Sequence, residues 1–245
     1  MIVRRVRKIG SSARFTWRAL RARWRDQRAE LAIIRRHVRR GDTVCDVGAH
    51  KGSYTYWLSR WVGNSGRVLA FEPQPSLAAY LRDVATASNV IIEQKALWSG
   101  SGTLDLFVPA PNSPSASLVA KASGGTHLKV PVVALDDYVP PEERISLIKL
   151  DAEGAELAIF RGATRILSEY RPWLVFECEN RHLPEGSVED VFAFLNGLGY
   201  EGFFFKRGAV LPLSAFDPAI HQKPSGPRFW DHPDYCNNFL FRPRS

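Results

Sequence analysis

Residues Asp46–Thr55 have the sequence DVGAHKGSYT, in which an acidic residue is followed by glycines two and six positions later. The apolar run TVC precedes this stretch, and the segment SYTYWLSRWV, which has the pattern of a helix, begins inside it. Glycine allows the backbone to adopt positive φ and lets a ligand approach the main chain closely. The stretch therefore predicts a buried strand, a tight turn and a helix, with a ligand site at the turn.

Apolar segments alternate with amphipathic ones along the rest of the chain. The expected further strands are RVLAFEP (67–73), VIIEQKAL (90–97), GTLDLFVPA (102–110), LKVPVVALDDYV (128–139), ISLIKLDAEG (145–154) and PWLVFECEN (172–180). Strands separated by helices of about 10 to 15 residues indicate βαβ units and a parallel sheet. The closing runs EGFFFK and NNFLFRP indicate an antiparallel edge. We therefore expect an α/β fold with a mostly parallel sheet, an antiparallel C-terminal edge and helices on both faces.

Charge divides the chain into two parts. Residues 1–40 hold 14 Lys and Arg against two acidic residues, a formal charge of +12, whereas residues 41–245 carry −4. We therefore expect a basic N-terminal arm over 1–40 and a single body over 41–245. The apolar residues of the arm recur at helical spacing over 15–40 and predict an amphipathic helix with one apolar face, made of Trp17, Leu20, Trp24, Leu31, Ile34 and Val38. Residues 1–13 show no such period.

The composition predicts a cytoplasmic protein. No stretch reaches the roughly 18 to 20 apolar residues that a spanning helix needs, and the arginine-rich N-terminus lacks the apolar region of a signal peptide. Cys45, Cys178 and Cys236 are odd in number and far apart. They predict buried thiols in a reducing compartment, and not a disulfide framework or a zinc site.

Two acidic residues at strand ends indicate the ligand. A dinucleotide site would have a glycine where Asp46 stands, and a carboxylate there repels a pyrophosphate and attracts an ammonium group. Glu72, which ends the next expected strand, can accept hydrogen bonds from both hydroxyls of a ribose. The site therefore favours a ligand with a ribose and a cationic amino-acid end, and S-adenosylmethionine fits better than NAD. The alternative is a tight turn with an incidental acid.

Several segments together resemble the FkbM family of S-adenosylmethionine-dependent methyltransferases. They are GDTVCDVGAHKGSYT, VLAFEPQPSLAAYL, QKALW followed by SGTLDLFV, VPVVALDDYV, ISLIKLDAEGAELAIFRGA, PWLVFECEN and NNFLFRP. The resemblance covers roughly 41–245 and leaves the basic arm outside. It implies a Rossmann-like class I methyltransferase fold and O-methyl transfer, often onto sugar or polyketide hydroxyls. His50 stands where the family pattern has an asparagine, but it can still donate or accept a hydrogen bond.

The resemblance also implies a set of cofactor-binding residues. We expect Asp46 to face the methionine ammonium directly or through water, Glu72 to hold the ribose, and the backbone near the third strand to contact the adenine. The expected set is Asp46, Gly48, Ala49, His50, Gly52, Glu72, Lys95, Ala96 and Asp151.

A hydroxyl acceptor benefits from a base that removes its proton as the new bond forms. Asp151 is the first candidate, Glu177 the second, and Glu179 is a third acid at the same strand end. These acids could instead hold a divalent ion, although no dedicated metal-site spacing is present. Glu153 and Glu156 also suit a helix N-terminus.

Other residues are less specific. His127 and His182 are interpreted as loop histidines. The Pro/Ser/Gly-rich loop 109–127, with Ser115 and Ser117, is either a lid or a surface insertion. Trp230 and Tyr235, in a polar loop, are candidates for acceptor contact.

The basic arm leaves several partners open. It could pack on the body, form a homodimer contact, cover the substrate cleft, lie peripherally on the inner membrane surface or bind RNA. Nucleic acid is disfavoured because the body is acidic and contains no recognisable RNA module. The predicted function is S-adenosylmethionine-dependent O-methylation of a sugar, glycoconjugate or similar small acceptor. The alternatives are an RNA methyltransferase tethered by the arm and a non-catalytic cofactor-binding module.

Overall fold

A computed structural model of the chain describes residues 2–119, 124–183 and 185–244, with side chains from residue 10 onward. Its main sheet has eight strands in the order β10-β9-β11-β8-β7-β1-β2-β3. The strands are β1 (Thr43–Val47), β2 (Arg67–Phe71), β3 (Val90–Glu93), β7 (Ile145–Leu150), β8 (Trp173–Glu177), β9 (Tyr200–Lys206), β10 (Ala209–Pro212) and β11 (Asn238–Pro243). β3, β2, β1, β7 and β8 pair in parallel, whereas β11, β9 and β10 pair antiparallel. The predicted α/β architecture is confirmed.

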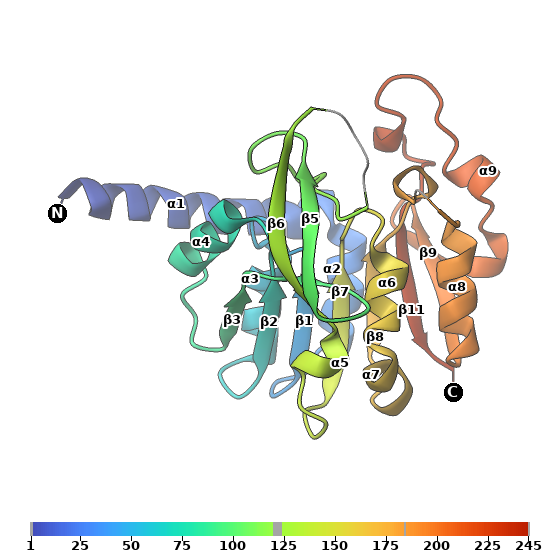
Figure 1. Cartoon of the computed structure of the whole chain (residues 1–245), viewed down its shortest axis with the longest axis horizontal. Helices are drawn as coiled ribbons and strands as arrows, with labels where there is room; N and C mark the ends of the chain where they lie inside the picture. Colours follow the sequence, from blue (N-terminus) through green and yellow to red (C-terminus); the bar gives the residue numbers. More distant parts are fainter. Residues whose placement is uncertain (1, 120–123, 184, 245) are drawn as a thin grey trace.

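Helices cover both faces of this sheet (Figure 1). α2 (Arg28–His37) and α3 (Ser53–Val62) pack on one face, where Leu31, Leu58 and Val62 share a buried cluster with strand residues such as Val44. α6 (Glu156–Arg161), α7 (Thr164–Glu169) and α8 (Val188–Gly197) pack on the other. The remaining helical segments of the body are α4 (Pro75–Val84), α5 (Leu135–Tyr138), η2 (Asn180–His182), η3 (Leu213–Ala215), α9 (Pro218–His221) and η4 (Phe229–Asp231). The predicted arrangement of helices on both faces is confirmed.

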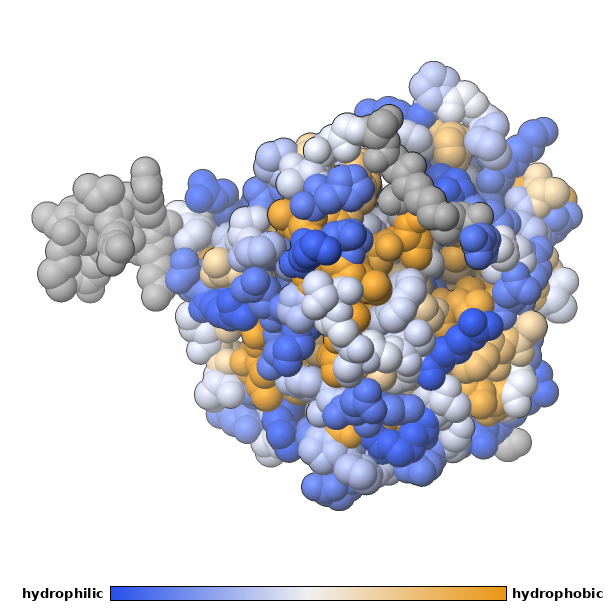
Figure 2. Space-filling model, in the orientation of Figure 1, coloured by the Kyte–Doolittle hydropathy of each residue, from blue (hydrophilic) through white to orange (hydrophobic). Residues whose placement is uncertain are grey.

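A second, smaller sheet stands beside the carboxyl ends of the parallel strands (Figure 1). Its order is β4-β6-β5, with β4 (Ala96–Leu97), β5 (Gly102–Val108) and β6 (Thr126–Val133). Hydrophobic residues reach the surface between hydrophilic ones over β5, β6 and α6 (Figure 2). The sequence predicts these strands as extended segments but does not predict a separate sheet, because strand pairing depends on contacts far apart in the chain.

The arm is helical over almost its whole length. It consists of α1 (Ile2–Arg21), the π-helical turn η1 (Ala22–Asp26) and α2. α1 therefore includes most of 1–13, for which the sequence showed no period. It runs past α3 and α4 (Figure 1).

The expectation that these six apolar residues share one face is wrong for the first half of the arm. Leu31, Ile34 and Val38 are fully buried, but Trp17 and Trp24 are exposed. A π turn holds one residue more than an α turn, so η1 rotates the face that reaches the body. The residues of α1 and η1 that pack inward are Phe15, Ala19 and Ala22, and those left outside are Trp17, Leu20 and Trp24.

The three cysteines are buried free thiols, as the sequence predicts. Among the described residues, no helix combines the length and the apolarity needed to cross a membrane.

Candidate active site

The turn after β1 is built around Gly48. Gly48 has φ +70°, and a Cβ on it would lie 1.9 Å from the carbonyl oxygen of Asp151. The amides of Gly48 and Ala49 both donate to the carbonyl oxygen of Phe71 at 3.0 Å. The turn is thereby fixed between the ends of β2 and β7. Gly52, with φ +77°, precedes the first residue of α3. Gly48 is required by its close approach to the backbone of Asp151 and Gly52 by its positive φ, so both glycines hold the tight turn that the sequence predicts.

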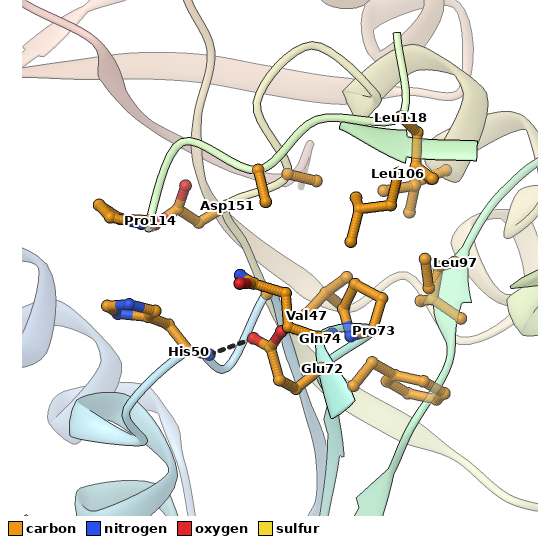
Figure 3. A pocket seen from close by; sticks show the side chains of 16 residues that line it. Val47, His50, Glu72, Pro73, Gln74, Leu97, Leu106, Pro114, Leu118 and Asp151 are labelled. Atoms are coloured by element: carbon orange, nitrogen blue, oxygen red, sulfur yellow. Dashed lines mark hydrogen bonds between the residues drawn. The ribbon is translucent and has the colours of Figure 1, made fainter. Parts of the chain in front are cut away.

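A cavity opens above this turn, at the carboxyl ends of β1 and β2 (Figure 3). Leu97, Leu106 and Leu118 gather at one side of it, while His50 and Asp151 lie at the other. Its lining consists of Val47, Gly48, His50, Phe71, Glu72, Pro73, Gln74, Ala96, Leu97, Leu106, Pro114, Ala116, Leu118, Asp151, Ala152 and Ile159. A flat apolar group such as a purine suits the side with the leucines, and a polar group suits the side with His50 and Asp151. We refer to this space as the cofactor cavity.

Glu72 lies in the middle of the cofactor cavity and is only 3% exposed. Its two carboxylate oxygens accept hydrogen bonds from the amides of His50 at 2.7 Å and Gln74 at 2.9 Å. Burial raises the pKa of Glu72 to about 7, although these amide hydrogen bonds act in the opposite direction. A carboxylate held by two amides keeps lone pairs for further donors, which the two hydroxyls of a ribose would supply.

The loop after β5 closes one side of the cofactor cavity. The carbonyl oxygen of Asn112 lies 3.3 Å from the Nε2 atom of His50, and the side-chain amide Nε2 of Gln74 donates to the carbonyl oxygen of Ser113 at 3.0 Å. Burial lowers the pKa of the His50 imidazole, which favours its neutral form. Ser117 donates to the carbonyl oxygen of Glu153 at 2.7 Å. Pro114, Ala116 and Leu118 of this loop line the cavity, whereas residues 120–123 of the expected lid lie outside the described residues.

Asp46 lies beneath the cofactor cavity and does not line it. It is fully buried, and one carboxylate oxygen accepts a hydrogen bond from the Thr55 hydroxyl at 2.5 Å. The other oxygen lies 3.7 Å from the Nζ atom of Lys149 and has no hydrogen-bond partner among the described residues. The expected contact of Asp46 with the methionine ammonium, directly or through water, stays a prediction.

Lys149 lies at the site but was not among the expected site residues. Its side chain is 7% exposed, and its ammonium group lies 3.7 Å from Asp46 and 3.8 Å from Asp151. It also donates to the carbonyl oxygen of Gly48 at 3.3 Å. The pairing Asp46↔Lys149 between β1 and β7 brings these side chains to the same face. A single basic residue inside the apolar run SLIKL was the available signal.

A second cavity, of about 200 Å³, lies on the α2 and α3 side of the sheet, and Asp151 lines both cavities. It is polar. Its lining consists of Asp26, Gln27, Glu30, Tyr54, Lys149, Leu150, Asp151, Val175, Phe176, Glu177 and Asn238. Tyr54 is 7% exposed, and the Nζ atom of Lys149 lies 4.8 Å from the centroid of its ring. The Oε1 atom of Gln27, another lining residue, is buried without a hydrogen-bond partner among the described residues, which indicates a site for a polar ligand. We refer to this space as the polar cavity.

The other two candidate bases differ in their surroundings. Burial, together with the nearby Asp151, raises the pKa of Glu177 well above its usual value, which favours the neutral carboxylic acid. Burial opposes ionisation of Glu179 too, but hydrogen bonds from Arg181, Tyr235 and Asn237 lower the pKa of that carboxyl to about 2. Glu177 lines the polar cavity, whereas Glu179 lines neither cavity. The side-chain amide of Asn237 donates to the carboxyl groups of both residues, at 2.8 Å to Glu177 and 3.0 Å to Glu179.

The structure thus brings together five of the nine expected cofactor-binding residues at the cofactor cavity, namely Gly48, His50, Glu72, Ala96 and Asp151. Ala49 and Gly52 belong to the turn but do not line the cofactor cavity. Lys95 pairs with Glu93 at 3.2 Å. Glu156 is buried, where burial raises its pKa to about 7, and it accepts a hydrogen bond from the amide of Gly154 at 3.0 Å.

The remaining candidates lie around the site. His182 pairs with Glu153, and the ring of His127 lies tilted against that of Phe107, with the centroids 5.3 Å apart. Tyr235 donates to Glu179, and Trp230 lies under the guanidinium of Arg181. Within the part of the chain that the structure describes, no group of three or more His, Cys, Asp or Glu residues is arranged to hold a metal ion.

The fold and the cavity together define a class I S-adenosylmethionine-dependent methyltransferase. The sheet is of the expected type, the glycine turn forms the wall of a cavity with an apolar side, and Glu72 presents a carboxylate suited to ribose hydroxyls. The FkbM methyltransferase domain matches residues 46–201, and the chain belongs to this family. S-adenosylmethionine is its cofactor.

Two relatives with assigned names share part of the sequence. The hexuronic acid methyltransferase AglP of Haloferax volcanii is 29% identical over 167 residues, which cover 64% of this chain and 67% of that protein. Methyltransferase 1 of Beauveria bassiana is 28% identical over 144 residues, which cover 49% of this chain and 57% of that protein. The match thus spans little more than half of the second relative.

Two solved structures share the fold. An FkbM methyltransferase from Methylobacillus flagellatus superposes with a TM-score of 0.51 at 18% identity, covering 82% of this chain and 43% of that one. A protein from Clostridium thermocellum, provisionally described as an rRNA methylase, superposes with a TM-score of 0.51 at 13% identity. The superposition covers 88% of this chain and 94% of that one. At such identities the likeness shows the fold alone.

Proposed function

We propose that this protein transfers the methyl group of S-adenosylmethionine to a hydroxyl of a sugar or glycoconjugate bound in the polar cavity. The observation that carries the proposal is that Asp151 lines both cavities, so that a donor in one and an acceptor in the other would meet at its carboxylate. The hexuronic acid named for the Haloferax relative is also a sugar derivative, which supports this class of acceptor.

When bound, S-adenosylmethionine supplies a methyl group activated by its sulfonium. The residues of this chain then have to align the acceptor oxygen with that methyl group and take its proton. Asp151, with 37% of its side chain exposed, is the accessible base. Glu177 in its neutral form can donate a hydrogen bond to a second hydroxyl of the acceptor. Lys149 holds Asp151 in place through the ion pair at 3.8 Å.

The charges of the polar cavity favour an acceptor without a carboxylate. Asp26 and Asp151 contribute carboxylates, whereas burial raises the pKa of Glu30 and Glu177 and so favours their neutral acids, and Lys149 is the basic residue of the described lining. Its charge is already matched by Asp46 and Asp151. A uronate would bring another negative charge among these acids, at a cost. A neutral polyol or an amino sugar would instead find hydrogen-bond acceptors.

The test is a transfer assay with labelled methyl groups and three matched glycosides: a neutral hexoside, an amino-hexoside and a hexuronoside. We expect transfer to one of the first two in preference to the third. We expect Asp151→Asn to lower kcat by about 10²–10⁴-fold. The isosteric Glu177→Gln should lower it by about tenfold at most, because the glutamine amide can still donate a hydrogen bond to the acceptor. Full turnover in Asp151→Asn, or preference for the hexuronoside, would contradict the proposal.

A further inference from the structure

The outer face of the arm exposes apolar side chains that the body does not cover. Trp17 is 59% exposed, Leu20 40% and Trp24 67%. They are three of the five large hydrophobic side chains that are exposed among the described residues. Their spacing of three and four residues places them on one side of the helix. We refer to Trp17, Leu20 and Trp24 as the outer tryptophan face.

The exposure does not come from a detached helix. On the opposite side of the arm, Phe15 and Ala19 are buried against α3 and α4. The ring of Phe15 meets that of Tyr56 edge-on at 5.4 Å. The indole of Trp57 donates to the carbonyl oxygen of Ala19 at 2.7 Å, and Arg18 donates to the hydroxyl of Tyr80 at 2.9 Å. The body therefore holds the arm by one side and presents the other.

Cationic side chains flank the outer tryptophan face. Arg14, Arg21 and Arg25 are exposed, and the guanidinium of Arg21 lies 5.6 Å from the Trp17 ring centroid. That of Arg23 lies 5.0 Å from the Trp24 ring. The arm as a whole has 14 basic residues against two acidic ones. Tryptophan favours the boundary between water and lipid, and arginines beside it bind anionic headgroups.

We propose that the outer tryptophan face docks the protein on an anionic lipid surface. Trp17, Leu20 and Trp24 enter the headgroup boundary, while the flanking arginines bind lipid phosphates. The next residues of the arm, Gln27 and Glu30, line the polar cavity. If the proposed function holds, docking therefore brings the acceptor cavity close to the lipid surface, where the sugar of a lipid-linked glycan would lie.

Two other occupants fit less well. A stable dimer buries about 800 Å² on each partner, far more than three partly exposed side chains supply. RNA would gain from the arginines and from stacking on tryptophans, but it gives Leu20 no role, and the body beyond the arm carries −4. A lipid boundary uses both the charges and the aliphatic side chain.

The experiment is co-sedimentation of the full chain with vesicles of phosphatidylcholine alone and of phosphatidylcholine mixed with phosphatidylglycerol. We expect binding to the mixed vesicles, and loss of about tenfold or more of that affinity in the double variant Trp17→Ser/Trp24→Ser. The matched control is Trp230→Ser, a 45% exposed tryptophan outside the arm, which should bind as the wild type does. Higher salt should weaken binding, because the arginine contacts are screened.

Cofactor titration of the same variants separates this proposal from the proposed function, since vesicle binding requires no methyl transfer. Unchanged cofactor affinity in the double variant shows that the body is intact. Equal binding to both kinds of vesicle, or vesicle binding that the double substitution leaves unaltered, would overturn the proposal. So would a dimer in sedimentation velocity that the substitution dissociates, or tighter binding to single-stranded RNA than to the mixed vesicles.

Discussion

The two cavities that meet at Asp151 differ in origin as well as in character. The cofactor cavity is lined by residues of the body within 47–159, all inside the matched family domain. The polar cavity takes Asp26, Gln27 and Glu30 from the arm and Asn238 from β11, all outside that match. If the proposed function holds, the difference teaches that the donor side of this site lies within the family domain, whereas the acceptor side also takes residues from the arm and from β11.

The largest expected effect concerns Lys149, which lies between the two cavities. Lys149→Met would leave Asp46 fully buried without its ion partner. Removing one member of a buried pair costs roughly 3–5 kcal/mol, and we expect the free energy of unfolding to fall by about 3 kcal/mol, since Thr55 still donates to Asp46. Urea denaturation at neutral pH measures this change.

The matched control is Lys129→Met. The Lys129–Asp105 pair has a similar separation, 3.8 Å, but the two side chains are 80% and 60% exposed. Exposed pairs contribute about 0–1 kcal/mol, so this variant should unfold almost as the wild type does. Similar losses in the two variants would mean that Lys149 is not the support common to both cavities.

Sequence patterns identified one cavity and missed most of the other. Gly48, Glu72 and Asp151 were predictable because each follows an apolar strand, and the carboxyl ends of parallel strands meet at one edge. Lys149 and Tyr54 were not, because their roles depend on the register of β1 against β7 and on the packing of α3. Trp17 and Trp24 were assigned to the same helix face as Leu31 because the periodicity contains no sign of the π turn that rotates α1.

The second prediction tests the cofactor cavity alone. Since burial raises the pKa of Glu72 to about 7 from an ordinary 4.5, the carboxyl is partly protonated near neutrality. Ribose hydroxyls donate to the ionised form, so cofactor affinity should rise with pH through about 7. The free energy of unfolding of the cofactor-free protein should instead fall as pH rises towards this pKa, because the folded state binds the proton more tightly than the unfolded state does. Calorimetric titration should give about tenfold weaker binding at about pH 6 than at about pH 8.

Glu72→Gln should bind the cofactor less tightly and with little dependence on pH. Glu156→Gln is the control, because burial also raises the pKa of Glu156 to about 7, yet this residue does not line the cofactor cavity. It should leave the pH profile as in the wild type. If instead Glu156→Gln flattened the profile and Glu72→Gln did not, the ribose would have to be assigned elsewhere.

The smallest expected effect tests the polar cavity from the side of the arm. Gln27 lines that cavity, and its Oε1 atom is buried without a hydrogen-bond partner among the described residues. An acceptor hydroxyl that donates to it would contribute about 0.5–1.5 kcal/mol. Gln27→Ala should therefore raise KM for the acceptor by about three- to tenfold and leave kcat and cofactor affinity nearly unchanged. Gln94→Ala, at a glutamine that lines neither cavity, should change none of these quantities. If Gln27→Ala lowered the affinity for the cofactor and left KM for the acceptor unchanged, the assignment of the two cavities would be reversed, because the arm would then contribute to the donor side of the site.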